Sequence, residues 1–239
     1  MKLWLIRKTK YWFTRLRLHV LFMPVIGAFE QLVWLTRMSR WVATKPKLAY
    51  DDFPGGKWNY LKRYPYFEHL RAQLDNATPL LYLEFGVAQG HSFKWWLAHD
   101  ANTASRFHGF DTFEGLPEDW GDFKRGAMTT GSKLPEVNDA RASFHKGMFQ
   151  DTLPPVLASL RRDGMRMIAH MDADLYSSTL YALTSLAPHF RSGDLILFDE
   201  FFVPTHEFRA YTQFLQAYLI QMEPIAAANN YCFVAFRVK

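Results

Sequence analysis

The sequence predicts an open α/β domain in which a mostly parallel sheet carries helices on both faces. From residue 80 onward, short apolar runs alternate with helical stretches, and this alternation indicates parallel strands joined by right-handed crossovers. With 239 residues, the chain is long enough for one well-buried core and a small appendage. Hydrophobic residues make up 49% of it, which indicates a folded chain rather than a disordered one.

Seven strands are expected. Five are parallel strands at residues 80–84, 106–111, 143–146, 165–172 and 194–199, and a hairpin of residues 223–228 and 231–238 closes the sheet. The expected helices are 91–99, 153–162, 177–189 and 207–221. Because ligands bind beyond the carboxyl ends of the strands in such a sheet, Glu84, Asp111, Asp172 and Asp199 should meet at one edge.

The N-terminal part differs in composition from the rest. Residues 1–47 carry ten Lys or Arg and one acid, Glu30, so their net charge is +9 and the remaining residues sum to −4. We expect a basic, aromatic, helical cap with a linker over residues 1–66, and the main domain over 67–239. Charges interrupt the apolar runs, so neither a spanning helix nor a signal peptide is predicted. The segment could cover the main domain, contact a second copy, or lie on an anionic membrane surface.

Charge and cysteine content narrow the function. The acidic main domain has no field that would attract a phosphate backbone, so nucleic acid is not expected as a partner. Cys232 is the single cysteine, which leaves no intrachain disulfide and no thiolate metal site. These features fit a cytoplasmic protein, and we expect it to form homo-oligomers. Association with a membrane stays open.

A glycine-containing turn follows the first strand of the main domain. The segment EFGVAQGHS (residues 84–92) places Gly86 and Gly90 where the backbone can approach a ligand at a helix N-terminus, although such turns also serve packing alone. Asp111, in GFDTFEGLPEDW (residues 109–120), ends the next strand. A carboxylate there can accept hydrogen bonds from both ribose hydroxyls of an adenosine ligand, or it can be a surface acid that caps the next helix.

Four further acids predict a cation site. Asp172 and Asp174 lie in HMDADLYSSTLYAL (residues 170–183), and Asp199 and Glu200 in LILFDEFF (residues 195–202). With no Lys or Arg among them, their repulsion favours a divalent ion, and oxygen ligands favour Mg²⁺ over Mn²⁺ or Ca²⁺. Asp174 or Glu200 could instead stabilise a helix N-terminus. His145 and His170 are candidate bases or structural hydrogen-bonding groups.

The combination of these segments with KGMFQDTLP (residues 146–154) resembles the macrocin-type O-methyltransferases of antibiotic sugar tailoring, relatives of the mycinamicin and novobiocin enzymes. The resemblance covers about residues 80–202 and leaves the N-terminal segment out. It implies a Rossmann-like methyltransferase fold, and S-adenosylmethionine and Mg²⁺ as cofactors. Residues 113–141 would form a lid that excludes water.

The resemblance also implies site residues. The cofactor would contact Glu84, Gly86, Val87, Gly90, Ser92, Asp111, Thr112, Met148, Phe149 and Asp172, with Met148, Phe149 and Gln150 beside the adenine. The metal would be held by Asp172, Asp199 and Glu200, and Asp172 and Asp174 would be catalytic, with Asp174 near the acceptor hydroxyl. The family commonly has two aspartates where this chain has Asp199 and Glu200.

The expected activity is methylation of a hydroxyl on a small molecule, and the expected acceptor is a sugar or a glycosylated metabolite. A nicotinamide-dependent oxidoreductase is disfavoured because the sequence lacks GxGxxG. A catalytically inactive scaffold or membrane-associated partner protein is the alternative from another class, and the complete set of acids disfavours it.

Overall fold

The computed structural model describes residues 2–162 and 164–239, and they form two compact units. Among the described residues, the first unit ends at Thr44 and the second begins at Lys45. The second unit is the α/β domain that the sequence predicts.

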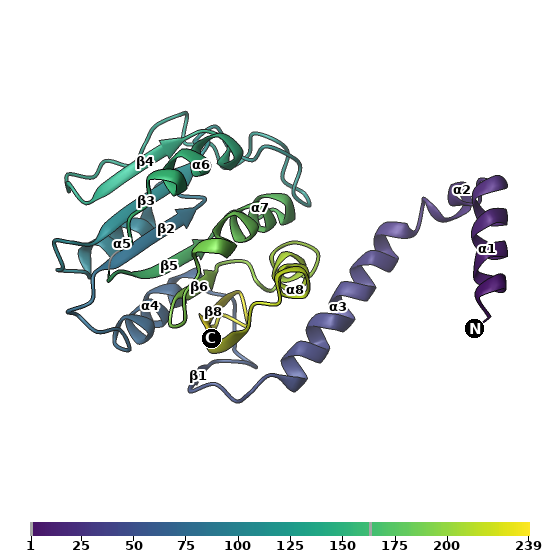
Figure 1. The fold of residues 1–239 in the computed structure, drawn as a ribbon, viewed down its shortest axis with the longest axis horizontal. Helices are drawn as coiled ribbons and strands as arrows, with labels where there is room; N and C mark the ends of the chain where they lie inside the picture. Colours follow the sequence, from purple (N-terminus) through teal and green to yellow (C-terminus); the bar gives the residue numbers. More distant parts are fainter. Residues whose placement is uncertain (1, 163) are drawn as a thin grey trace. The chain divides into compact units, whose positions relative to one another are not determined.

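An eight-stranded sheet forms the centre of this domain (Figure 1). Its order is β1-β7-β8-β6-β5-β2-β3-β4, and only β8 runs antiparallel to its neighbours. The strands are β1 (Tyr50–Asp51), β2 (Leu80–Phe85), β3 (Arg106–Asp111), β4 (Ala142–Lys146), β5 (Arg166–Met171), β6 (Leu195–Phe198), β7 (Met222–Ala228) and β8 (Phe233–Val238). The predicted seven strands are therefore confirmed, and β1 is an additional edge strand.

Helices cover both faces of the sheet. On one face lie α4 (Arg63–Arg71) and α5 (His91–Ala98), and the other carries α6 (Phe149–Ser159), α7 (Tyr176–Leu186) and α8 (Glu207–Tyr218), which pack in a row (Figure 1). Two short 3₁₀ turns, Tyr60–Lys62 and Ala187–His189, precede α4 and follow α7. Between β3 and β4, residues 112–141 form a long irregular loop.

The central strands are buried on both faces, which explains their continuous apolar sequences. All six residues of β2 and all four of β6 are buried. The register pairs Phe85 with Phe110 on one side and with Met171 on the other, and Met171 pairs with Phe198. Glu84, Asp111, Asp172 and Asp199 therefore lie at or next to strand ends along one edge of the sheet.

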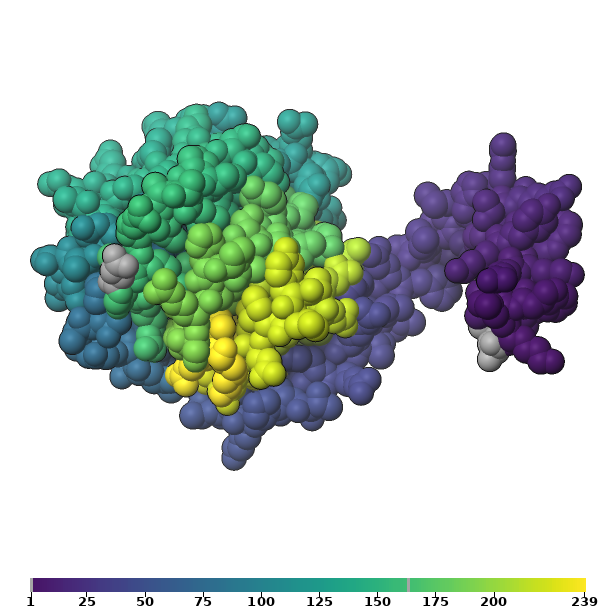
Figure 2. All heavy atoms as spheres, in the orientation of Figure 1, coloured from purple at the N-terminus to yellow at the C-terminus, as the bar shows by residue number. Residues whose placement is uncertain are grey.

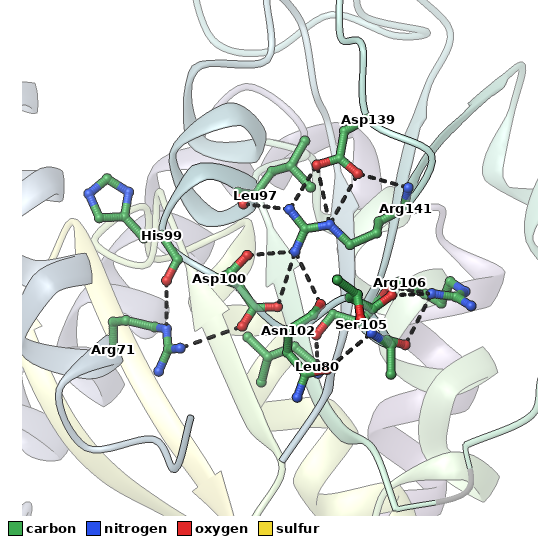
Figure 3. A network of polar contacts seen from close by, with 12 residues as sticks. Arg71, Leu80, Leu97, His99, Asp100, Asn102, Ser105, Arg106, Asp139 and Arg141 are labelled. Atoms are coloured by element: carbon green, nitrogen blue, oxygen red, sulfur yellow. Dashed lines mark hydrogen bonds and ion pairs between the residues drawn. The ribbon is translucent and has the colours of Figure 1, made fainter. Parts of the chain in front are cut away.

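At the amino ends of the strands, opposite the acidic side chains, a polar network surrounds the buried Asp100 (Figure 3). The guanidinium of Arg141 donates to the carbonyls of Leu97, Asp100 and Asn102, so it closes the C-terminus of α5. Arg71 and Arg141 also lie 3.5 and 3.7 Å from the buried Asp100 carboxylate. These contacts join α4, α5 and the start of β4 at the edge away from the acidic strand ends.

The expected boundary between the N-terminal segment and the main domain needs correction. Residues 51–66, expected to be a linker, belong with residues 45–50 to the α/β unit, because Tyr50 and Asp51 pair with Ala226 and Ala227 of β7. Side chains reinforce this attachment, since Gly55 N–H donates to Asn230 and Asn59 N–H to Asn229. Sequence composition could not indicate a pairing across such a separation.

The N-terminal unit is helical, as expected. It contains α1 (Leu3–Arg15), α2 (His19–Phe22) and α3 (Ile26–Thr44). None of the described helices is long and apolar enough to cross a membrane.

Candidate active site at the carboxyl edge of the sheet

A cavity of about 330 Å³ opens at the carboxyl ends of β2, β3, β5 and β6. Strand ends, the 112–141 loop and the start of α6 all contribute to its wall. The residues that line it are Tyr60, Arg63, Gly86, Ala88, Asp111, Thr112, Gly115, Leu116, Pro117, Trp120, Phe123, Met128, Met148, Phe149, Gln150, Asp172, Ala173, Asp174, Ser178, Asp199 and Glu200. This list contains every predicted metal and catalytic residue.

Gly86 allows the turn after β2 to pack directly against the end of the neighbouring strand β5. Its φ of +93° lies in the left-handed region, and a Cβ there would sit 1.8 Å from the carbonyl oxygen of Asp172. The Gly86 N–H donates to the carbonyl of Phe110 at 2.9 Å. Only glycine lets this turn lie directly against the end of β5, so it brings the β2 turn and Asp172 to the same wall.

Asp111 is held by the backbone of that turn. Its Oδ2 accepts hydrogen bonds from the N–H groups of Val87 and Ala88 at 2.8 and 2.7 Å, and its Oδ1 accepts from Phe113 N–H at 2.7 Å. Each carboxylate oxygen can accept a second bond, so the side chain keeps acceptor capacity toward the cavity. Its position is therefore fixed before any ligand binds.

Acidic and basic groups meet where β5 and β6 end. His170, Asp172 and Asp199 each offer a ligand atom, and these atoms lie within 4.8 Å of one another. Asp199 is buried, and its Oδ1 has no hydrogen-bond partner among the described residues. Glu200 lines the cavity but lies outside this group, where Tyr60 Oη–H donates to its Oε1 at 3.2 Å.

No Lys or Arg lies among these acids in the sequence, but the fold brings one to them from a distant segment. Arg63, the first residue of α4, donates from Nη2 to Asp199 Oδ2 at 2.6 Å and from Nη1 to Ser92 Oγ at 3.1 Å. Burial opposes its charge, but Asp199, Asp172 and Glu84 outweigh burial and raise the pKa of Arg63. A fixed guanidinium therefore already balances part of the negative charge.

His170 supplies a second cation beneath the cavity. Its Nδ1 lies 2.8 Å from Tyr82 Oη and its Nε2 3.5 Å from Asp199 Oδ1. Burial alone would lower its pKa, but contacts with Asp199 and Glu84 outweigh burial and raise the pKa of His170 to about 10. With both nitrogens facing protein groups and 1% of its surface exposed, His170 has a structural role. His145, the other candidate base, contacts His108 on β3 and does not line the cavity.

In three other carboxyl groups of the cavity the surroundings disfavour the charged form and so raise the pKa. Burial, followed by repulsion from Asp199, raises the pKa of Asp172. Burial and then Glu200 raise the pKa of Asp174 to about 7, and burial and then Asp199 raise the pKa of Glu200 to about 7. The cavity thus concentrates more carboxylates than Arg63 and His170 can neutralise, which is the electrostatic condition that favours an added cation.

The structure separates the expected cofactor contacts into two sets. Gly86, Asp111, Thr112, Met148, Phe149 and Asp172 line the cavity, whereas Glu84, Val87, Gly90 and Ser92 do not. Glu84 is buried and accepts a hydrogen bond from Tyr82, Val87 donates its N–H to Asp111, and Ser92 faces Arg63. A Cβ on Gly90 would lie 2.9 Å from the ring of Pro135. These four residues support the wall from behind.

Several lining residues carried no signal that the sequence analysis could use. Arg63 and Tyr60 come from the segment expected to be a linker, and no motif surrounds them. Leu116, Trp120 and Phe123 lie on the irregular loop, where no periodicity indicates which side chains point inward.

Comparison with known proteins agrees with this geometry. Residues 83–201 match a family described as a methyltransferase domain. Over 182 residues the chain is 28% identical to the 8-demethyl-8-(2,3-dimethoxy-alpha-L-rhamnosyl)-tetracenomycin-C 4'-O-methyltransferase of Streptomyces olivaceus, covering 65% of this chain and 67% of that protein.

Solved structures show the same fold. The O-methyltransferase NovP superposes with a TM-score of 0.59 at 21% identity, over 74% of this chain and 79% of its own. The calicheamicin methyltransferase CalS11 superposes with a TM-score of 0.56 at 20% identity, over 74% and 77%. The matched segment contains the β2 turn, Asp111, Asp172 and Asp199, and these matches together support an S-adenosylmethionine-dependent O-methyltransferase.

Proposed function

We propose that this enzyme methylates a sugar hydroxyl of a glycosylated small molecule and uses a divalent cation to do so. The observation that carries the proposal is one cavity in which the β2 turn and Asp111 meet Asp172, Asp174 and Asp199. The Streptomyces olivaceus relative is named for methylation of a rhamnosyl group, which supports a glycosidic acceptor.

The residues present fit the cofactor. Gly86 and Ala88 leave the backbone of the β2 turn open to the cavity, and Asp111 is placed to accept the ribose hydroxyls. Met148 and Phe149, at the start of α6, offer apolar surface for an adenine. When bound, S-adenosylmethionine supplies an electrophilic methyl group on a sulfonium, and a divalent cation lowers the pKa of the hydroxyl that is to be methylated.

The residues also fit a hard divalent cation. Asp172 and Asp199 would hold it, because their carboxylates converge and the buried Asp199 Oδ1, with His170 Nε2 3.5 Å away, has no hydrogen-bond partner among the described residues. Glu200 is our third proposed ligand. Since Arg63 holds only Oδ2 of Asp199, the other oxygen can coordinate while this ion pair persists.

The other groups of the cavity position the acceptor and control its proton. Asp174 lines the cavity beside Asp172 and, in this proposal, accepts the proton that the hydroxyl loses. Leu116, Trp120 and Phe123 cover the cavity from the 112–141 loop and exclude water from the reacting groups. Tyr60 holds Glu200 through its hydroxyl and offers an aromatic edge to a sugar.

A turnover assay with methyl-labelled S-adenosylmethionine tests the proposal. The acceptors are glycosylated metabolites, each paired with its sugar-free counterpart. We expect label on a sugar oxygen of the glycosylated member and none on its counterpart. Chelation with EDTA should abolish turnover, and added Mg²⁺ should restore it.

The outcomes separate the parts of the proposal. Label on the sugar-free counterparts would overturn the glycosidic acceptor, and turnover that persists in EDTA would overturn the cation. The control variant is Asp122→Asn, which changes an exposed acid of the same loop that does not line the cavity. It should retain wild-type turnover in every condition.

A further inference from the structure

The N-terminal unit exposes an unusual amount of apolar surface. Seventeen large apolar side chains between Leu3 and Leu35, among the described residues, are each at least 38% exposed. Figure 2 draws this segment in purple to blue, at the N-terminal end of the chain. The most exposed members are Leu21, Val20, Trp4, Met23 and Leu3, at 60–71%. Single exposed apolar residues are ordinary, but this many within one short segment indicate a surface that contacts something else.

Basic side chains surround the apolar residues of α1. Arg7, Lys8, Lys10 and Arg15 lie within its thirteen residues, and α1 contains no acid. Lys8 Nζ lies 4.4 Å from the ring centroid of Trp4, and the Arg15 guanidinium 5.4 Å from that of Trp12. Aromatic rings next to ammonium and guanidinium groups are typical of helices that lie at the boundary between lipid headgroups and acyl chains.

The segment after α1 is more apolar. From Leu18 to Phe29 the sequence has no Asp, Glu, Lys or Arg, and Val20, Leu21, Phe22, Met23, Val25, Ile26 and Phe29 are all exposed. Phe22 stacks on Phe13 of α1 with ring centroids 5.6 Å apart, so α1 and α2 form one patch. With 13 residues, α1 extends about 20 Å, which is shorter than the roughly 30 Å hydrocarbon core of a bilayer.

We infer that α1, α2 and the start of α3 bind the surface of an anionic lipid bilayer. The net positive charge of this segment favours an anionic partner, because residues 2–35 carry six Lys or Arg and one acid, Glu30. A second copy docking through the same patch would place these like charges against each other, whereas acidic headgroups neutralise them and the acyl region receives the apolar side chains. This inference goes beyond the proposed methylation and does not depend on it.

Vesicle flotation of the full-length protein tests the inference, with no cofactor or acceptor present. One set of vesicles is phosphatidylcholine alone, and the other includes about 30% phosphatidylglycerol to provide a negative surface. We expect the protein to float with the anionic vesicles and to bind the neutral ones at least about tenfold more weakly. High salt should weaken the anionic binding because exposed charges are screened.

Two matched variants locate the contact. Arg7→Glu/Lys8→Glu/Lys10→Glu should lower affinity for anionic vesicles by at least about tenfold. Lys57→Glu/Lys94→Glu/Lys133→Glu makes the same change in net charge on exposed residues of the α/β unit and should leave binding unchanged. Thermal unfolding of both variants checks that the α/β unit stays folded.

Three results would overturn the inference. They are absence of flotation with anionic vesicles, equal loss of binding in the two variants, and a stable dimer in solution that masks the patch and binds no vesicles. The last result would assign the patch to a second copy. Because the assay measures binding alone, a failed methyltransferase assay cannot be confused with a failure here.

Discussion

Asp199 lies next to both positively charged side chains of the active site, Arg63 and His170. Arg63 occupies one of its oxygens at 2.6 Å, and His170 lies 3.5 Å from the other. The sequence places Asp199 correctly, because an aspartate directly after a buried parallel strand must lie at the carboxyl edge. Arg63 could not be placed in this way. It lies 136 residues away in sequence, and nothing local to it indicates the contact.

Replacing Arg63 should reveal how much of the site depends on this ion pair. Arg63→Met leaves the buried Asp199 with one fewer cation, and we expect a loss of about 3 kcal/mol in the free energy of unfolding in metal-free buffer. Mg²⁺ should recover part of that loss by supplying the missing charge. Urea unfolding with and without MgCl₂ measures both effects.

The control for this variant is Lys124→Met, which breaks an ion pair with Asp119 whose side chains are 77% and 56% exposed. It should change stability by less than about 0.5 kcal/mol and show no magnesium response. If Arg63→Met matched the control in both respects, the ion pair would not balance the acids of the cavity.

Replacing Asp172 should lower the rate of catalysis without weakening the binding of S-adenosylmethionine. Asp172→Asn keeps the size of the side chain but removes a charge beside Asp199, so the proposed cation loses a ligand. We expect kcat to fall by about a hundredfold or more, while the Kd for S-adenosylmethionine changes by less than about threefold. Steady-state kinetics and calorimetry measure these quantities. Equal losses in both would show that Asp172 acts mainly through cofactor binding and would contradict its role as a cation ligand.

At the scale of elements, the turn between β2 and α5 connects the sheet to the site. The sequence predicts the strand, the turn and the helix, because an apolar run is followed at once by glycines. It cannot predict that Gly86 is required by the carbonyl of Asp172, since that contact joins two strands far apart in sequence. Likewise, the inward-facing residues of the 112–141 loop follow no repeat.

Gly86→Ala should disrupt this connection. The added Cβ would lie 1.8 Å from Asp172 O, so either the turn or the end of β5 must move. We expect a loss of stability of about 3 kcal/mol or more, together with loss of S-adenosylmethionine binding. Gly56→Ala is the matched control, because a Cβ there meets nothing within 4 Å. Wild-type affinity in Gly86→Ala would show that the turn does not hold the cofactor.

The contact between β3 and β4 should make stability depend on pH. His108 Nδ1 lies 3.0 Å from His145 Nε2, and burial, followed by His145, lowers the pKa of His108 to about 4. Between this value and the unfolded value near 6.5, the unfolded chain binds more protons. Stability contributed by neutral His108 is therefore complete above about pH 6.5 and is lost as pH falls toward about 4.

His108→Gln should remove this part of the pH dependence. The wild-type free energy of unfolding, measured by urea titration, should fall between pH 6.5 and 4 by up to about 3 kcal/mol more than that of the variant. His91→Gln, which replaces an exposed histidine of α5, is the comparison and should follow the wild type. Parallel curves for wild type and His108→Gln would contradict the assignment.

For the whole molecule, the sequence predicts the strands and their order better than it predicts the boundary between the two units. Seven strands, their mainly parallel order and the acidic edge follow from apolar runs that end in aspartates. The additional strand β1 could not be predicted, because it consists of two residues whose partners lie in β7. For the same reason residues 45–66, predicted to lie outside the main domain, belong to the same unit as that domain.

The N-terminal unit and the catalytic unit also differ in chemistry. The catalytic unit buries its apolar residues and gathers acids around one cavity, whereas residues 3–35 leave apolar and basic groups exposed. Composition separates the two parts in the sequence. The structure adds the exposure on which the proposed bilayer contact rests.

A crystal structure with S-adenosylhomocysteine and MgCl₂ is the most direct test of the proposed active site. We predict the nucleoside in the cavity with its ribose on Asp111 and its adenine beside Met148 and Phe149, and a magnesium ion on Asp172 and Asp199. A cofactor bound elsewhere, or a bound cofactor with Asp172 and Asp199 turned apart and no ion between them, would contradict the account.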